Sequence, residues 1–221
     1  FCMRKSLDIQ MGELFSGPGG IACGIDMAAT SASYADINIE HAWANDIDPS
    51  ACATYRRNIR IDPTRVICKD VNSIDLSSLP PINALSFGFP CNDYSIVGRQ
   101  QGIKGNYGPL YGFGVRALSY HHPDWFLAEN VSGLKTANDG VALQYILNDL
   151  YHEGYDLFPH LYRFEEYGVP QTRHRIIIVG IRKDLHKTFL VPRPSNKICT
   201  CKQAIENPPI PKDAFNNELT K

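Results

Sequence analysis

Glycines and acidic residues recur at points where the chain is predicted to leave a strand. Residues 15–20 read FSGPGG and join an apolar run to a helical pattern, so their backbone amides could bind a carboxylate or phosphate at a helix N-terminus. Asp46 ends the next apolar run, where a carboxylate can accept both hydroxyls of a ribose. Asp70 ends the third run and could accept from an adenine amino group. Together these positions predict a crevice for an adenosine-shaped ligand.

The glycine turn taken alone is a weak signal, because strand-to-helix glycine turns are often only tight turns. Its spacing departs from G-x-G-x-x-G and no basic P-loop sequence follows, which disfavours a nicotinamide or a nucleoside triphosphate. Asp48 has a simpler predicted role, as the cap of the helix that Pro49 begins.

The elements that must position these residues alternate between strand and helix. The apolar, β-rich runs lie at about 7–15, 39–45, 64–69, 82–89, 125–130, 155–164 and 175–182. Helical patterns lie at about 21–32, 49–59, 109–120 and 141–152. This alternation predicts an α/β fold with a doubly wound, mostly parallel sheet and helices on both faces. Only a short turn at 168–170 joins the last two runs, which predicts an antiparallel edge strand.

Two segments interrupt the alternation. Residues 90–108 contain four glycines and are predicted to form one long loop. Long loops in compact domains are usually either functional or disordered. After Val191 the chain turns to Pro, Asn, Lys and Ser. We interpret residues 1–192 as one catalytic domain and residues 193–221 as a linker.

Composition sets outer bounds on the class of protein. With 221 residues, 43% of them hydrophobic and 20% charged, the chain can form one sizeable core. It has no apolar run of about 18 residues and no secretory pattern at its start, so we expect an intracellular protein, cytoplasmic or nucleoid-associated if bacterial, without a membrane partner. Seven scattered cysteines predict reduced thiols and no metal site. The net charge of −1 gives no sign of nucleic-acid binding.

Four segments, read in order, resemble the signature blocks of the DNA cytosine-5 methyltransferases. They are residues 15–20 (FSGPGG), 89–95 (FPCNDYS), 129–131 (ENV) and 171–175 (QTRHR). The resemblance extends from about Leu7 to Arg182 and implies a Rossmann-like methyltransferase fold with S-adenosyl-L-methionine as cofactor. It also implies methyl transfer to carbon 5 of a cytosine that is flipped out of double-stranded DNA. The implied cofactor-binding residues are Phe15, Ser16, Gly17, Gly19, Gly20, Ile21, Asp46, Ile47, Asp70, Val71, Phe89 and Leu110.

The resemblance also implies which residues carry the chemistry. Carbon 5 of cytosine is a weak nucleophile, and Cys91 is implied to activate it by adding as a thiolate to carbon 6. Glu129 is implied to donate a proton to ring nitrogen 3, a role that burial of its carboxyl would support. Asn130 is implied to hold the loop around Cys91 by hydrogen bonds.

Arg173 and Arg175 alternate on one predicted strand and should therefore point to the same face. Their guanidinium groups would suit the cytosine carbonyl and a flanking phosphate, and Gln171 would hold the two side chains in place. By the same resemblance, residues 92–108 form the lid over the extruded base, and Ser95 contacts the backbone beside it.

The chain departs from the family at several points. Asn92, Asp93 and Tyr94 follow the cysteine where glutamine, a small residue and phenylalanine are usual. The family also carries a variable target-recognition region and a final helix after the arginine block. We find neither in the sequence, and we expect them from a missing C-terminal part or a second polypeptide.

A DNA enzyme of this family would have a restriction endonuclease as its functional counterpart. Three other functions are compatible with parts of the sequence. An RNA (tRNA) cytosine-5 methyltransferase would share this core. A non-catalytic regulatory relative would not need Cys91, Glu129 and both arginines together. A nicotinamide dehydrogenase with the same sheet would leave Cys91 and Glu129 unexplained.

Overall fold

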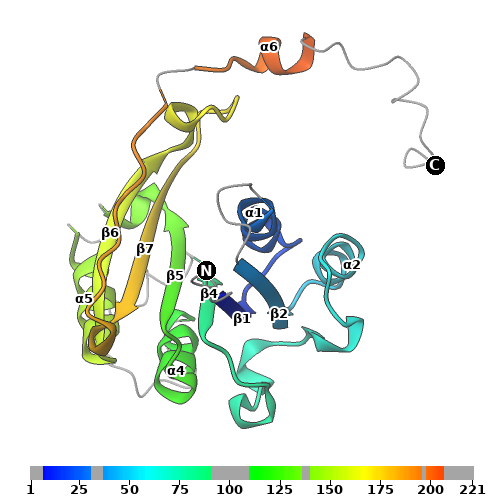
Figure 1. The fold of residues 1–221 in the computed structure, drawn as a ribbon, viewed down its shortest axis with the longest axis vertical. Helices are drawn as coiled ribbons and strands as arrows, with labels where there is room; N and C mark the ends of the chain where they lie inside the picture. Colours follow the sequence, from blue (N-terminus) through cyan, green and yellow to red (C-terminus); the bar gives the residue numbers. More distant parts are fainter. Residues whose placement is uncertain (1–6, 31–36, 91–109, 136–139, 196–197, 207–221) are drawn as a thin grey trace, which may run out of the picture.

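The computed structural model describes residues 7–30, 37–90, 110–135, 140–195 and 198–206. The strands described there form one sheet with the order β3-β2-β1-β4-β5-β7-β6 (Figure 1). They are β1 (Leu7–Leu14), β2 (Ile37–Asp46), β3 (Val66–Cys68), β4 (Ala84–Gly88), β5 (Trp125–Val131), β6 (Tyr155–Arg163) and β7 (His174–Arg182).

The direction of each strand decides which residues share an edge of the sheet. Strands β1 to β5 pair in parallel, as the alternating pattern predicted. Strand β7 lies between β5 and β6 and is antiparallel to both. The predicted doubly wound sheet with an antiparallel edge is therefore confirmed, with β6 outermost. Because β7 runs backwards, its first residues meet the last residues of β5.

Helices cover both faces of the sheet. These helices are α1 (Gly20–Ala29), α2 (Pro49–Asn58), α4 (Tyr111–His121) and α5 (Val141–His152). The short helix α6 (Cys201–Glu206) is exposed and lies apart from the sheet (Figure 1). Helices α1 and α2 pack on one face, where Ala22 and Tyr55 meet Ala44 and Val66. Helices α4 and α5 pack on the other face in a larger core that includes Phe87 and other strand residues. In the described ranges, none of the helices has the length and apolar character that crossing a membrane requires.

Strand β5 shows how one segment serves both the core and the site. Phe126, Ala128 and Asn130 are buried, and the first two join the core formed with α4 and α5. Their neighbours Leu127 and Glu129 are partly exposed on the opposite face. This period of two places the acid outside the apolar core and its neighbour Asn130 within it.

The segment predicted as a linker contains structure of its own. Thr200 and Gln203 exchange hydrogen bonds of 2.9 and 3.2 Å in the pattern of a capping box, at the start of α6. Before it, the Tyr167 hydroxyl donates to the Pro192 carbonyl (2.9 Å), and Ser195 N donates to the Glu166 carbonyl (2.8 Å). The chain after residue 192 thus begins by packing on the turn between β6 and β7. The domain boundary at residue 192 remains a prediction.

A close approach of β5 and β7 gives a test of this packing. A Cβ atom added to Gly180 of β7 would overlap the ring of buried Phe126. We expect Gly180→Ala to lower the free energy of unfolding by about 1–3 kcal/mol, because the added methyl group would force Phe126 or the backbone to shift within a packed core. Gly24→Ala in α1, where no atom lies within 4 Å, should instead stabilise the helix slightly. Urea unfolding of both variants checks this, and equal midpoints would contradict it.

Candidate functional site

The glycine loop after β1 is held in an unusual backbone conformation. Phe15, Gly17 and Gly19 have φ angles of 55°, 53° and 94°, and α1 begins at Gly20. Phe15 is the informative one, because a non-glycine residue in the left-handed region stores strain, and such strain clusters at functional sites. A Cβ atom on Gly19 would lie 3.0 Å from Tyr55 Cδ2, so the loop rests directly on α2.

Asp46 fixes this loop from the neighbouring strand. Its Oδ2 accepts from Gly17 N at 2.7 Å, and its Oδ1 accepts from Asp48 N at 2.9 Å. An ionised carboxylate has about four acceptor positions, so each oxygen keeps capacity for a ribose hydroxyl. Asp48 accepts from Ser50 N and Ala51 N, which confirms the cap predicted for α2.

The other predicted cofactor residues divide into exposed and buried sets. Asp70 is exposed, and it uses Oδ1 to cap the 3₁₀ turn η3 (Val71–Ser73). Ile47 is an exposed apolar side chain, with 66% of its surface accessible. Val71 and Phe89 are buried in the core, and Leu110 is half-buried at the start of α4. Ser16 is also buried, and Ile21 is half-buried.

These residues suit the predicted cofactor. Phe15 to Ile21, Asp46 and Asp70 follow the carboxyl ends of three adjacent parallel strands, where open α/β sheets bind ligands. A Cβ atom on Gly17 or Gly20 would meet nothing within 4 Å, so the loop borders open space. The donor set therefore offers backbone amides, carboxylates and an exposed apolar side chain, as an adenosine-containing ligand requires.

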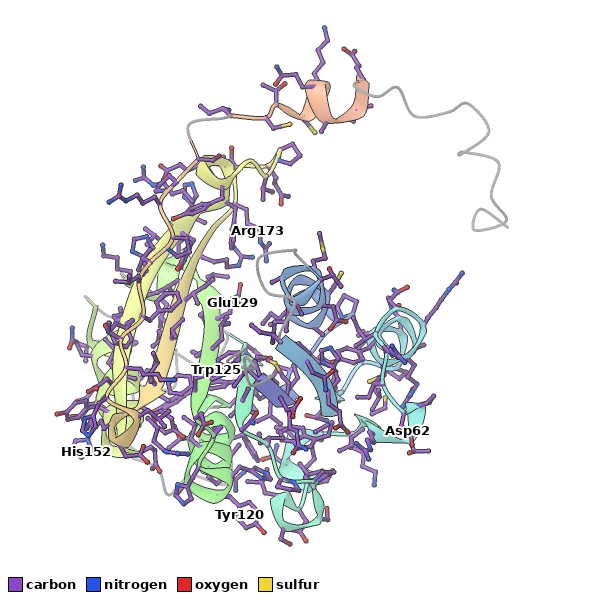
Figure 2. All side chains as sticks on the ribbon, viewed as in Figure 1. Asp62, Tyr120, Trp125, Glu129, His152 and Arg173 are labelled. Atoms are coloured by element: carbon purple, nitrogen blue, oxygen red, sulfur yellow. The ribbon has the colours of Figure 1, made fainter. Side chains whose placement is uncertain are left out.

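The chemical end of the site is built across β5 and β7 (Figure 2). Glu129 Oε1 accepts from Arg175 Nε at 2.8 Å and lies 3.8 Å from an Arg173 guanidinium nitrogen. Both arginines point to one face, as their spacing predicted. The Glu129 side chain is 26% exposed, so its burial is only partial. Arg175 also donates to the His174 carbonyl at 2.8 Å, which fixes its guanidinium at two points.

Asn130 and Gly88 connect this end to the cofactor end. Asn130 Nδ2 donates to the carbonyl of Phe89, two positions before the predicted nucleophile in the sequence, at 2.9 Å. Gly88 pairs with Glu129, and its missing side chain leaves room beside Glu129 Oε2 and the Phe15 carbonyl. The glycine loop and the acid therefore border the same space. Cys91, Ser95 and the predicted lid at 92–108 lie outside the described residues.

The predicted brace of the arginines differs from the observed one. Gln171 is exposed, and across the described ranges its side chain forms no hydrogen bond with either arginine. Glu165 binds this segment instead, through Arg173 N and the His174 imidazole. Sequence spacing could not identify Glu165, because its contact depends on how the turn between β6 and β7 folds back.

Glu13 is a second residue that the sequence interpretation missed. It lies on β1, is 1% exposed, and accepts from the Tyr55 hydroxyl at 2.9 Å. Its Oε1 and the neighbouring Ser86 Oγ, although near each other, have no hydrogen-bond partner of good geometry in the described structure. Burial raises the pKa of the Glu13 carboxyl to about 7. The available signal was a charged residue next to apolar Leu14, in the half of β1 that leads into the glycine loop.

Comparison with known proteins identifies the family. The model of the C-5 cytosine-specific DNA methylase family matches residues 9–220. The chain belongs to this family. It is 52% identical to Type II methyltransferase M.BbvI of Brevibacillus brevis over 97% of the chain and 60% of that protein. It is 37% identical to Type II methyltransferase M.NgoFVII of Neisseria gonorrhoeae over 95% and 55%. The chain thus spans a little over half the length of these relatives.

Solved structures agree with this assignment. A candidate DNA modification methyltransferase from an Escherichia coli prophage matches with a TM-score of 0.68 and 26% identity, over 89% of this chain and 54% of that one. The Dnmt2 methyltransferase of S. pombe matches with a TM-score of 0.63 and 16% identity, over 91% and 56%, which supports the fold alone. The predicted methyltransferase fold and the cofactor S-adenosyl-L-methionine are confirmed by the family to which the chain belongs.

The buried Glu13 should make the stability of this chain depend on pH. Its pKa is about 7 in the folded protein and about 4.5 in the unfolded chain, so the folded state holds the extra proton between these values. Stability should therefore fall as pH rises from about 4.5 to 7 and level off above. Glu13→Gln should remove this dependence and be more stable than wild type at pH 8 by about 2–3 kcal/mol. Urea unfolding at pH 5 and pH 8 measures the difference; parallel profiles would refute the argument.

Asp46 and Asp48 give a matched test of the ribose position. Asp46→Ala removes the acceptor for Gly17 N as well as any ribose contact, so we expect the dissociation constant for S-adenosyl-L-methionine to rise at least about tenfold, or about 1.4 kcal/mol. Asp48→Ala loses only the cap of α2, with about 1 kcal/mol less stability and an unchanged dissociation constant. Isothermal titration calorimetry measures the dissociation constant for S-adenosyl-L-methionine in both variants. An unchanged constant in Asp46→Ala would show that the ribose binds elsewhere.

Proposed function

We propose that this chain is the catalytic part of a DNA cytosine-5 methyltransferase that methylates carbon 5 of a flipped-out cytosine in duplex DNA. The observation that carries the proposal is the Glu129–Arg175 pair, which faces the glycine loop across Gly88. A carboxyl group held in place by guanidinium groups beside the cofactor crevice suits a residue that must be oriented toward ring nitrogen 3 of the nucleobase. Trapping a covalent adduct on DNA or on RNA distinguishes this function from the predicted alternatives, an RNA enzyme and a regulatory relative.

The binding half of the mechanism rests on the ends of β1, β2 and β3. The glycine loop and Asp46 would hold the carboxylate and ribose of S-adenosyl-L-methionine, and Asp70 would accept from its adenine amino group. When bound there, the cofactor supplies an electrophilic methyl group. Ile47 would cover one apolar side of it.

The reacting half would use Cys91, Glu129 and the arginines. The Cys91 thiolate adds to carbon 6 of the extruded cytosine, while Glu129 places a proton on ring nitrogen 3. The electron pair of the C5–C6 bond would then form the new bond from carbon 5 to the methyl group, as the bond between that methyl and the cofactor sulfur breaks and S-adenosyl-L-homocysteine leaves. A general base would take the proton from carbon 5, and the electron pair of that C–H bond would restore the double bond as the Cys91 thiolate departs and the proton on ring nitrogen 3 returns to Glu129. Arg175 orients Glu129 throughout, and Arg173 is free to meet the cytosine carbonyl or a phosphate.

The partners follow from the same proposal. The two relatives named above are Type II methyltransferases, which supports duplex DNA as substrate and a restriction endonuclease as functional counterpart. Because this chain spans only part of those proteins, we propose that a further segment or a second polypeptide supplies target recognition.

Trapping the adduct tests the nucleophile. Full-length protein is incubated with labelled S-adenosyl-L-methionine and DNA containing 5-fluorocytosine, which blocks release because carbon 5 carries no removable proton. We expect a covalent complex in wild type, none in Cys91→Ser, and a normal amount in Cys23→Ser, a control at an exposed cysteine. An adduct on substituted RNA but not on DNA would favour the RNA enzyme. No adduct on either would favour the regulatory relative.

Glu129→Gln tests the acid separately. The amide retains the size of the side chain but cannot deliver the proton, so methyl transfer should slow by about 10²–10⁴-fold. The dissociation constant for the cofactor should change little, because Glu129 acts on the base. Single-turnover rates and calorimetry together measure both quantities. A rate near that of wild type would remove Glu129 from the mechanism.

A further inference from the structure

The first residues of β7 are held from two sides. On one side Arg173 and Arg175 reach Glu129, at 3.8 and 2.8 Å. His174 lies between them in sequence, so the pleat of the strand directs its side chain to the opposite side. There its Nε2 lies 2.7 Å from Glu165 Oε1. The backbone of the arginine segment is thus fastened by one carboxylate on each face.

Glu165 reaches this position from the turn between β6 and β7. It belongs to the 3₁₀ turn η8 (Phe164–Tyr167), and its Oε2 accepts from Arg173 N at 3.3 Å. The turn is closed beside it, because Phe164 N donates to the Arg173 carbonyl at 2.9 Å and Val169 N donates to the Phe164 carbonyl at 3.2 Å. One carboxylate therefore binds two consecutive residues at the point where the chain re-enters the sheet.

The contacts continue from Glu165 to the acid of the site. The carbonyl of His174 accepts from Arg175 at 2.8 Å, and the same guanidinium donates to Glu129. A shift of the His174 peptide would therefore move the guanidinium that orients Glu129. The hydrogen bond from His174 lowers the pKa of Glu165, so the carboxylate is ionised at neutral pH and both of its oxygens can accept.

We propose that Glu165 is a positioning residue of the methyltransferase: by holding Arg173 N and the His174 ring, it sets the place of the arginine pair at Glu129. The inference rests on the function proposed above and assigns that site a support on the far side of β7. Glu165 touches neither Glu129 nor the described cofactor residues. Its effect on the reaction must therefore pass through the arginine segment.

The neighbouring residue offers a matched control. Glu166 has a side chain of the same kind on the same turn, and its carboxylate lies 3.7 Å from a guanidinium nitrogen of exposed Arg163. Exposed pairs of this kind contribute little. A general loosening of the turn should affect Glu166→Ala as much as Glu165→Ala, whereas a positioning role should affect only the latter.

The test compares Glu165→Ala, Glu165→Gln and Glu166→Ala in full-length protein. Two quantities are measured: the solvent exchange of the Arg175 Nε–H by NMR, assigned through its loss in Arg175→Lys, and the single-turnover methyl transfer rate at saturating cofactor. We expect Glu165→Ala to speed exchange at least about tenfold and to slow transfer about 10–100-fold, since small misplacements cost rates of this order. The dissociation constant for the cofactor should stay within about twofold. Glu165→Gln, which keeps an acceptor, should recover most of the loss.

Each result decides the point. Exchange and transfer in Glu165→Ala that match wild type would overturn the proposal, as would equal losses in Glu165→Ala and Glu166→Ala. If wild-type protein transfers no methyl group to DNA, the proposed function fails. The exchange of Arg175 Nε–H still decides in that case whether Glu165 positions the pair.

Discussion

The reversed direction of β7 is the constraint on which the site depends. In a sheet of parallel strands alone, the residues beside the end of β5 would come from the end of another strand. Because β7 is antiparallel, Arg175 pairs with Val131 and Ile177 pairs with Glu129, so the beginning of one strand meets the end of the other. A carboxylate and a guanidinium from segments more than forty residues apart therefore face each other on rigid backbone. Ladder hydrogen bonds, rather than a loop, fix their separation.

The cofactor end depends on a similar use of strand geometry with different chemistry. Here the strands are parallel, and the ends of β1, β2 and β3 come together at one edge. Asp46 binds the glycine loop through Gly17 N, so the residue predicted to hold the ribose also sets the shape of the loop that it faces. Tyr55 supports Gly19 from below and is itself held by buried Glu13. The glycine loop, Asp46 and helix α2 are thus coupled, and a substitution in one of them should alter the energetic effect of a substitution in the others.

The sequence predicted the sheet, its antiparallel edge and the two arginines on one face because these follow from local periodicity. Alternation of two fixes which side chains share a face, and strand-end acids in parallel sheets fall at one edge. Local periodicity could not predict Glu13 or Glu165, which support the site from outside it. Glu13 has its partner 42 positions away, and Glu165 acts through the fold of a turn whose shape no spacing rule specifies. Gln171, conspicuous in the sequence, turned out to be exposed. The roles of Cys91 and Ser95 rest on the family resemblance alone.

In strand β5, the residues that form the core and the residues of the proposed site mostly point to opposite faces, and Asn130 is the exception. Glu129 is on the open face, so its replacement leaves the core untouched. Asn130 faces inward, is 2% exposed, and uses both ends of its amide, donating to the Phe89 carbonyl and accepting from Val131 N. Loss of that side chain would leave buried backbone groups unpaired, at about 1–3 kcal/mol each. The residue that ties β5 to the segment before Cys91 is therefore also one that the core requires, and the position of that segment cannot be altered there without a cost in stability.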